Sequence, residues 1–406
     1  MTSFDTSPQL NVWRALAALA VVFVMLATTG WTAVRHHREG TAVEASRTAW
    51  EHGRLDGHAL PDLDTATPDR LTRFFDRLNA AQRTTLVHDY PLAVGNMNGA
   101  PVELRYRANR VALLRQVRIE RTRTHDDRLT PSGQQLAGRR MQRFETLSDA
   151  DRQILAFDPD GSGRAAEVFG DLDSAERISV VVPGVDTDLL TFQRTNRRYS
   201  APVGMAQALY SAERKASPAT RTAVIAWADY TSPDGLGIDS ATAMRAESGA
   251  VRLNALLHAL PGGAPVSLFC HSYGSVVCGV AAHALPARVA DIAVAGSPGM
   301  RVEKAAQLDT DARVWAMRDA DDWVQDVPHL EVGGLGHGED PMARSFGARV
   351  LSARDAQGHG GYFEPGTDSL RNFADIGTGA YRSVECAHDD DACRAGLSDT
   401  TMAGRA

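Results

Sequence analysis

The chain has 406 residues, enough for one large domain with additions or for two ordinary domains. Its content of 43% hydrophobic and 23% charged residues is that of a globular protein and excludes a disordered chain. The formal net charge of −7 argues against a nucleic-acid-binding protein, which usually carries a basic face, and four cysteines are too few for a disulfide scaffold.

A long uncharged run lies close to the N-terminus. Residues 15–34 read ALAALAVVFVMLATTGWTAV, and as a helix they would span about 30 Å, the thickness of a bilayer core. Arg14 precedes the run, Arg35 follows it, and Trp13 and Trp31 lie near its ends, where amphipathic rings favour the membrane interface. We therefore expect a membrane localisation, with a single-pass anchor favoured over the cleaved signal of a secreted protein because no clean cleavage site follows.

The next part of the chain is predicted to be helical. Residues 35–67 are polar and punctuated by proline and glycine, which is typical of a linker with an early helix. Within an N-terminal helical segment, residues 68–150, apolar residues recur at helical spacing over 69–87 and 103–119. Residues 120–150 are charged and polar and could form helix or loop.

Short apolar runs dominate the sequence after residue 150. Helical stretches at 240–260 and 275–285 separate several of them, and strand–helix alternation predicts an α/β fold with a mostly parallel, doubly wound sheet over a core of residues 151–383. Ligands of such sheets bind beyond the carboxyl ends of the strands. The expected strands are QILAFD (153–158), AEVFGD (166–171), ISVVVPG (178–184), TAVIAWAD (222–229), VSLFCHS (266–272), ADIAVAGSPG (290–299) and RVWAMRD (313–319).

One strand runs directly into a serine and then into a helix, in the stretch VSLFCHSYGSVVCGVAAHAL. This is the context of a nucleophile elbow, in which Ser272 would be the nucleophile. The tight turn requires small neighbours: Gly274 satisfies one position, and Cys270 stands where glycine is usual. The backbone N–H of Tyr273, at the helix N-terminus, could stabilise an oxyanion. The alternative is a serine that happens to lie in a strand–helix turn.

A serine hydroxyl needs a base, and in this fold the order along the chain is serine, acid, histidine. His359 lies in DAQGHGGYF, a glycine-rich loop before a late helical stretch, and is the preferred base. His337 in GLGHGED is its competitor, whereas His283 lies on the elbow's own helix and faces the wrong way. Either loop histidine could instead be a solvated residue.

The acid is expected after the strand RVWAMRD, where Asp319, Asp321 and Asp322 all qualify by position. Asp322 is the preferred residue; its carboxylate would hold the tautomer of the histidine. A second oxyanion donor is expected after the strand ISVVV, where Gly184 permits a tight turn and the N–H of Val185 could face the site.

These motifs together resemble a known family. The runs VVVPGVDT, AWADY, CHSYGS, AGSPGM, DDWV and GHGGYF, with FFDRLNAAQRTTLVHDYPLAVGNMNGAPVELRYRANR before them, are similar to the actinobacterial α/β-hydrolase family DUF1023 over about residues 70–380. The resemblance implies the α/β-hydrolase fold and a Ser-Asp-His triad, which falls on Ser272, Asp322 and His359. It does not define a substrate.

The cysteines and one acidic turn need separate interpretations. In the polar C-terminal tail, residues 384–406, Cys386 and Cys393 are plausible disulfide partners, whereas Cys270 and Cys278 are expected to be small buried hydrophobes. The turn DPDGSG resembles a calcium loop only in its first acidic residues, so we expect a hairpin and no metal.

The sequence therefore predicts a serine hydrolase, specifically a carboxylesterase or lipase that acts on a small-molecule or lipid ester without a cofactor. Two alternatives remain open: a catalytically silent hydrolase-fold binding module at the membrane, and a peptidase or amidase with the same triad. The oligomeric state is not readable from the sequence.

Overall fold

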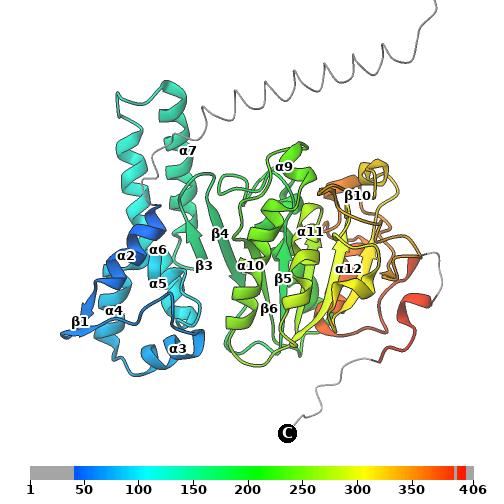
Figure 1. The fold of residues 1–406 in the computed structure, drawn as a ribbon, viewed down its shortest axis with the longest axis horizontal. Helices are drawn as coiled ribbons and strands as arrows, with labels where there is room; N and C mark the ends of the chain where they lie inside the picture. Colours follow the sequence, from blue (N-terminus) through cyan, green and yellow to red (C-terminus); the bar gives the residue numbers. More distant parts are fainter. Residues whose placement is uncertain (1–40, 388–390, 399–406) are drawn as a thin grey trace, which may run out of the picture. The chain divides into compact units, whose positions relative to one another are not determined.

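The computed structural model describes residues 41–387 and 391–398. From Ala42 onward the described chain forms one compact unit, built around an eight-stranded sheet with the order β12-β9-β8-β7-β5-β6-β4-β3 (Figure 1). The strands, in chain order, are β3 (Gln153–Asp158), β4 (Arg164–Phe169), β5 (Arg177–Val182), β6 (Thr222–Ala228), β7 (Val266–His271), β8 (Val289–Ala295), β9 (Arg313–Met317) and β12 (Arg349–Val350).

The sheet is mostly parallel, as the sequence predicts. All pairings from β12 across to β6 are parallel, and β4 alone runs against its neighbours, because it pairs antiparallel with both β6 and β3. Strands buried on both faces need apolar residues throughout, which explains continuous runs such as ISVVV in β5. The two-residue strand β12 escapes prediction because it is too short to produce a pattern.

Helices cover both faces of the sheet. On one face lie α8 (Pro202–Ala216) and α12 (Asp368–Thr378), whose Leu209 and Phe373 share a core with Val181 and Phe269 of the strands. On the other face lie α10 (Met244–Ala259) and α11 (Tyr273–Ala281), which pack on the alternate strand residues, such as Val180. The short helix α9 (Ile238–Ala241) precedes α10. Because side chains alternate along a strand, every strand of the sheet except the two-residue β12 contributes to both cores.

The helices that precede the sheet are α2 (Ala42–Glu51), α3 (Pro68–Asp76), α4 (Ala80–Asp89), α5 (Pro91–Gly95), α6 (Val102–Arg123) and α7 (Pro131–Leu147). The single helix expected over residues 69–87 is two helices, because Asn79 caps α4 in a reciprocal pair of hydrogen bonds with Gln82. The segment expected to be a linker with an early helix contains a helix, α2, and also the hairpin of β1 (Arg54–Leu55) and β2 (His58–Ala59), which was not predicted.

Two asparagines complete the free edge of the sheet at β3. The side chain of Asn96 donates to the carbonyl of Phe157 and accepts from its N–H, at 2.8 and 3.0 Å. Asn109, on α6, donates to the carbonyl of Ile154 at 2.9 Å. Backbone groups that would otherwise face outwards are thus bonded to the N-terminal helices.

The predicted membrane localisation is wrong, because the described structure contains no helix that could span a membrane. Within residues 41–387 and 391–398, no helix is both long and apolar enough to cross a bilayer. Helix α6 has 22 residues, but its sequence VELRYRANRVALLRQVRIERTR is rich in arginine. Residues 15–34, on which the prediction was based, lie outside the described residues.

Candidate active site

The three residues expected to form a triad lie on three loops at one edge of the sheet. Ser272 follows β7, Asp322 follows β9 after a short turn, and His359 follows β12 in a glycine-rich loop. Because β7, β9 and β12 are parallel, their carboxyl ends meet at the same edge. The fold therefore brings together residues up to 87 positions apart.

The backbone at Ser272 has the strained geometry of a nucleophile elbow, with φ 55° and ψ −128°. A side chain at Gly274 would meet the carbonyl oxygen of Val182, since a Cβ there would lie 2.2 Å from it. A Cβ at Gly184 would lie 2.6 Å from the Cβ of Ser272, so the loop after β5 passes directly against the serine. Glycine at both positions is what allows this close approach.

The imidazole of His359 joins the serine to the carboxylate. Its Nε2 lies 2.8 Å from the Oγ of Ser272, and its Nδ1 lies 2.9 and 3.0 Å from the two carboxylate oxygens of Asp322. Asp322 is fully buried, whereas the His359 side chain is 19% exposed at the edge of a pocket. This is the arrangement in which a base can take the serine proton and a carboxylate can stabilise the resulting imidazolium.

The carboxylate of Asp322 is held by further hydrogen bonds. Tyr362 donates its hydroxyl to Oδ2, and the N–H of Val324 donates to Oδ1 at 3.0 Å. Burial alone would raise the pKa of Asp322, but the hydrogen bond and charge of His359 and the hydrogen bond from Tyr362 bring this pKa below its ordinary value. The carboxylate is therefore ionised at neutral pH. Sequence reasoning missed Tyr362, although it lies three residues after His359 in the motif GHGGYF.

The structure separates the three candidate acids. Asp319 uses Oδ2 to accept from the N–H of Gly358, at 2.8 Å, and so holds the loop that carries His359. Asp321 is exposed, and its backbone N–H donates to Asp319. Of the three, Asp322 is the one that contacts the imidazole.

His271, next to the nucleophile, fixes the backbone of His359. Its Nε2–H donates to the carbonyl oxygen of His359 at 2.6 Å, and the two rings lie 4.8 Å apart. Burial, with a smaller contribution from the nearby His359, lowers the pKa of His271 to about 3. His271 is thus a neutral donor, a role that the sequence motif CHSYG did not reveal.

The buried neutral state of His271 predicts acid sensitivity. In the unfolded state His271 binds a proton once the pH falls below its ordinary pKa of about 6.5, whereas in the folded state its pKa is about 3. The free energy of unfolding therefore decreases as the pH falls from about 6.5 to about 3. The loss is up to about 1.4 kcal/mol per pH unit. Urea unfolding at several pH values should show a shallower dependence in His271→Gln but not in the control His258→Gln, an exposed histidine. Equal slopes in all three proteins would contradict this account.

The two residues predicted to supply oxyanion donors, Tyr273 and Val185, both lie close to Ser272. Tyr273 is the first residue of α11, so its N–H has no acceptor within the helix. Val185 lines the same pocket as Ser272, next to the close approach of Gly184. The side chain of Tyr273 points elsewhere: its hydroxyl donates to the carbonyl of Thr242 at 2.8 Å.

A disulfide spans the elbow. Cys270 and Cys278, expected to be separate buried residues, are bonded to each other, and Ser272 lies between them in the sequence. Cys270, which stands two residues before the serine where glycine is usual, therefore links the end of β7 to α11 through its disulfide. The expected second disulfide, between Cys386 and Cys393, is also present.

Opening the elbow disulfide is expected to reduce both stability and activity. A double Cys270→Ala/Cys278→Ala variant should lose about 2–3 kcal/mol of unfolding free energy from the unconstrained unfolded chain, and its kcat should fall because the elbow is no longer fixed. The variant Cys386→Ala/Cys393→Ala opens a loop of nearly the same length and is the control. Chemical denaturation and ester-hydrolysis rates would test this; equal kcat in both variants would refute a role at the elbow.

Other residues that the sequence singled out are engaged elsewhere. His337 is buried, with Nε2 2.7 Å from the carbonyl of Ser240 and its ring against Tyr273. The turn with Asp158 is the expected β3–β4 hairpin, and the Asp158 carboxylate is paired with Arg164.

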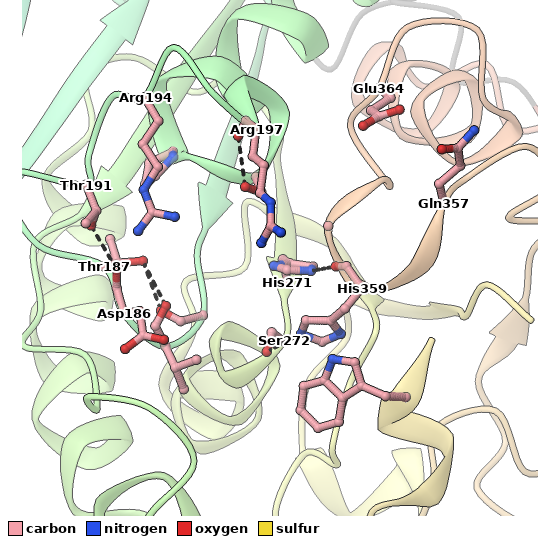
Figure 2. A pocket seen from close by; sticks show the side chains of 16 residues that line it. Asp186, Thr187, Thr191, Arg194, Arg197, His271, Ser272, Gln357, His359 and Glu364 are labelled. Atoms are coloured by element: carbon pink, nitrogen blue, oxygen red, sulfur yellow. Dashed lines mark hydrogen bonds between the residues drawn. The ribbon is translucent and has the colours of Figure 1, made fainter. Parts of the chain in front are cut away.

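Ser272 and His359 open into a cavity of about 550 Å³ (Figure 2). Its walls come from the loop after β5, from Trp323 and from the loop around His359. The ring of Trp323 lies 4.8 Å from that of His359. The volume falls within the range of small-molecule sites.

Comparison with known proteins agrees with this fold. A family model described as alpha/beta hydrolase, Abhydrolase_8, matches residues 158–332, which include Ser272 and Asp322. This is the family found; membership of DUF1023 stays a prediction.

Two curated relatives are uncharacterized mycobacterial proteins. One, from Mycobacterium tuberculosis, is 27% identical over 79% of this chain and 57% of its own length. The other, from Mycobacterium bovis, is 34% identical over 41% of this chain and 59% of its own length. The chain thus spans somewhat over half the length of the curated relatives it matches.

Among solved structures, a dienelactone hydrolase from Anabaena variabilis is similar at 17% identity and a TM-score of 0.32, over 53% of this chain and 88% of that one. An esterase of the bacterial hormone-sensitive lipase family is similar at 14% identity and a TM-score of 0.31, over 65% and 95%. The strand order and the family match together identify the fold of this chain as that of the α/β hydrolases.

Proposed function

We propose that this protein is a serine hydrolase that cleaves carboxylic esters through an acyl-enzyme, with Ser272 as nucleophile, His359 as base and Asp322 as the residue that orients it. The observation that carries the proposal is the 2.8 Å contact between His359 Nε2 and Ser272 Oγ, with Asp322 on the opposite ring nitrogen. A binding module would have no need for this alignment or for the strained serine backbone.

The reaction follows from these positions. Ser272 Oγ attacks the ester carbonyl carbon while His359 takes the hydroxyl proton, and the oxyanion binds the N–H groups of Tyr273 and Val185. His359 then gives the proton to the leaving alcohol, and an acyl ester remains on Ser272. A water molecule, deprotonated by His359, attacks this ester, and the acid leaves with Ser272 restored.

A fluorophosphonate probe tests the proposal. The probe should add one organophosphoryl group to the folded wild type, detected by intact mass, and Ser272→Ala should abolish this addition. Ser211→Ala, which removes an exposed hydroxyl on α8, should be labelled normally. No labelling of the wild type, or equal labelling of Ser272→Ala, would refute it. A panel of p-nitrophenyl esters and matching anilides then separates ester from amide hydrolysis.

A further inference from the structure

One wall of the cavity above Ser272 is cationic. Arg194 and Arg197 both lie on the loop between β5 and α8, and both line the cavity together with Ser272 and His359. Figure 2 shows their guanidinium groups directed from this loop towards the space over the nucleophile. Among the residues that the structure describes, neither side chain forms an ion pair or a hydrogen bond.

Neighbouring arginines of the same region behave differently. Arg198 donates to Gln207 at 2.6 Å and lies outside the cavity that holds Ser272. Arg143, on α7, donates to the backbone carbonyls of Leu190 and Gln193, at 2.8 and 2.5 Å, and so ties the middle of the loop to this helix. Of the three arginines between β5 and α8, the two that line the cavity are thus the two without a side-chain hydrogen bond among the described residues.

The backbone of the loop positions these side chains at a conformational cost. Arg197 has φ 51° and ψ 48°, the left-handed region that a residue with a Cβ rarely adopts. Ser200 stabilises this turn, since its N–H and its hydroxyl both donate to the carbonyl of Arg197, at 3.0 and 2.9 Å. Arg197 is thus held in a costly backbone conformation at the wall of the cavity that contains Ser272.

Two carboxylates, Asp186 and Glu364, also line the cavity, but neither forms an ion pair with Arg194 or Arg197 among the described residues. Asp186 already accepts from the N–H of Gly235 at 2.7 Å and forms no ion pair with either arginine among the described residues. Glu364 comes from the opposite wall, beside Gln357, away from the arginine loop (Figure 2). Neither carboxylate therefore occupies the guanidinium groups of Arg194 and Arg197, which stay available to a ligand in the cavity.

We propose that the ester cleaved at Ser272 carries an oxyanion, either carboxylate or phosphate, that binds Arg194 and Arg197. The inference rests on the proposed hydrolase function and deepens it by naming the substrate class. Planar guanidinium groups pair with two oxygens of a carboxylate or phosphate at once, and such charge-assisted hydrogen bonds are about twice as strong as neutral ones. The anion would hold the scissile carbonyl over Ser272.

A matched pair of esters provides the test. Mono-p-nitrophenyl adipate carries a terminal carboxylate, and p-nitrophenyl 6-methylheptanoate replaces that carboxylate with an isopropyl group of similar shape. The wild type should prefer the anionic ester in kcat/KM by roughly 10- to 100-fold, mainly through KM. Arg194→Gln/Arg197→Gln should lose this preference, so that the ratio of kcat/KM for the anionic ester to kcat/KM for the neutral ester falls to about 1. Arg198→Gln, from the same loop, should keep the preference.

Competition against fluorophosphonate labelling gives a readout that is independent of turnover. Inorganic phosphate and monomethyl adipate should each slow labelling of the wild type more than of the double variant, and the stronger competitor indicates which oxyanion is preferred. Equal rates on both esters, or a preference that survives in the double variant, would overturn the inference while the hydrolase stands. Absence of labelling and of turnover on both esters would instead refute the proposed function, and the inference with it.

Discussion

His359→Ala is expected to lower kcat for ester hydrolysis by about 10⁵–10⁶-fold, the scale seen when the histidine of a serine hydrolase is removed. Without Nε2 at 2.8 Å from Ser272 Oγ, nothing in the site takes the serine proton. The rings of His271 and Trp323 each lie 4.8 Å from the His359 ring, so truncation leaves an imidazole-sized gap between them. Added imidazole should therefore restore part of the activity.

The control for this variant is the competing histidine. His337 is bonded to the carbonyl of Ser240 rather than to the serine hydroxyl, so His337→Asn should stay within about 10-fold of wild type. Steady-state rates on a p-nitrophenyl ester, with Ser272→Ala as the background, provide the measurement. If His359→Ala kept more than about 1% of wild-type kcat, the base would have to be another group.

Asp322→Asn is expected to lower kcat by about 10⁴-fold. This is the size of the loss in a serine protease when asparagine replaces the triad aspartate and the histidine adopts the wrong tautomer. The carboxylate accepts a hydrogen bond from Nδ1–H of His359, and this tautomer leaves Nε2 unprotonated, so that it can take the proton of Ser272. An asparagine that presents its NH₂ group to Nδ1 favours the opposite tautomer, in which Nε2 already carries a proton. The fold should survive, because the two side chains have the same shape.

Asp319→Asn serves as the matched control. The Asp319 side chain contacts the N–H of Gly358 and not the imidazole, and an asparagine oxygen can still accept that bond. Its kcat should change by less than about 10-fold. Circular dichroism would verify that both variants are folded, and a larger loss in Asp319→Asn than in Asp322→Asn would reassign the acid.

Most of the architecture could be predicted because buried parallel strands leave a direct pattern. Seven of the eight strands in the sheet correspond to apolar runs such as VSLFCH and RVWAM. The break between α3 and α4 was missed although Asn79 and Gln82 show the spacing of a capping box, since the apolar spacing continues through it. The proposed boundaries of the linker (35–67), the N-terminal helical segment (68–150), the hydrolase core (151–383) and the C-terminal tail (384–406) remain predictions.

The candidate site was predictable where local sequence determines local geometry. The elbow at Ser272 needs only a strand, small neighbours and a helix, and the structure brings it together with the preferred Asp322 and His359, whose catalytic roles remain to be tested. Contacts made across the fold could not be read from the sequence. The hydrogen bond from Tyr362 to Asp322, the contact of His271 with a distant backbone carbonyl and the disulfide at Cys270 all depend on the folded sheet.

The asparagine contacts at β3 imply that the sheet of this chain does not form a stable separate unit without the helices before it. A shortened protein starting at residue 151 would lose Asn96 and Asn109, leaving the carbonyls of Phe157 and Ile154 and one N–H without partners. An open strand of that kind is a template on which a second molecule can add its own strand. Such a fragment should self-associate through β3, whereas a protein that retains α5 and α6 should not associate through this strand.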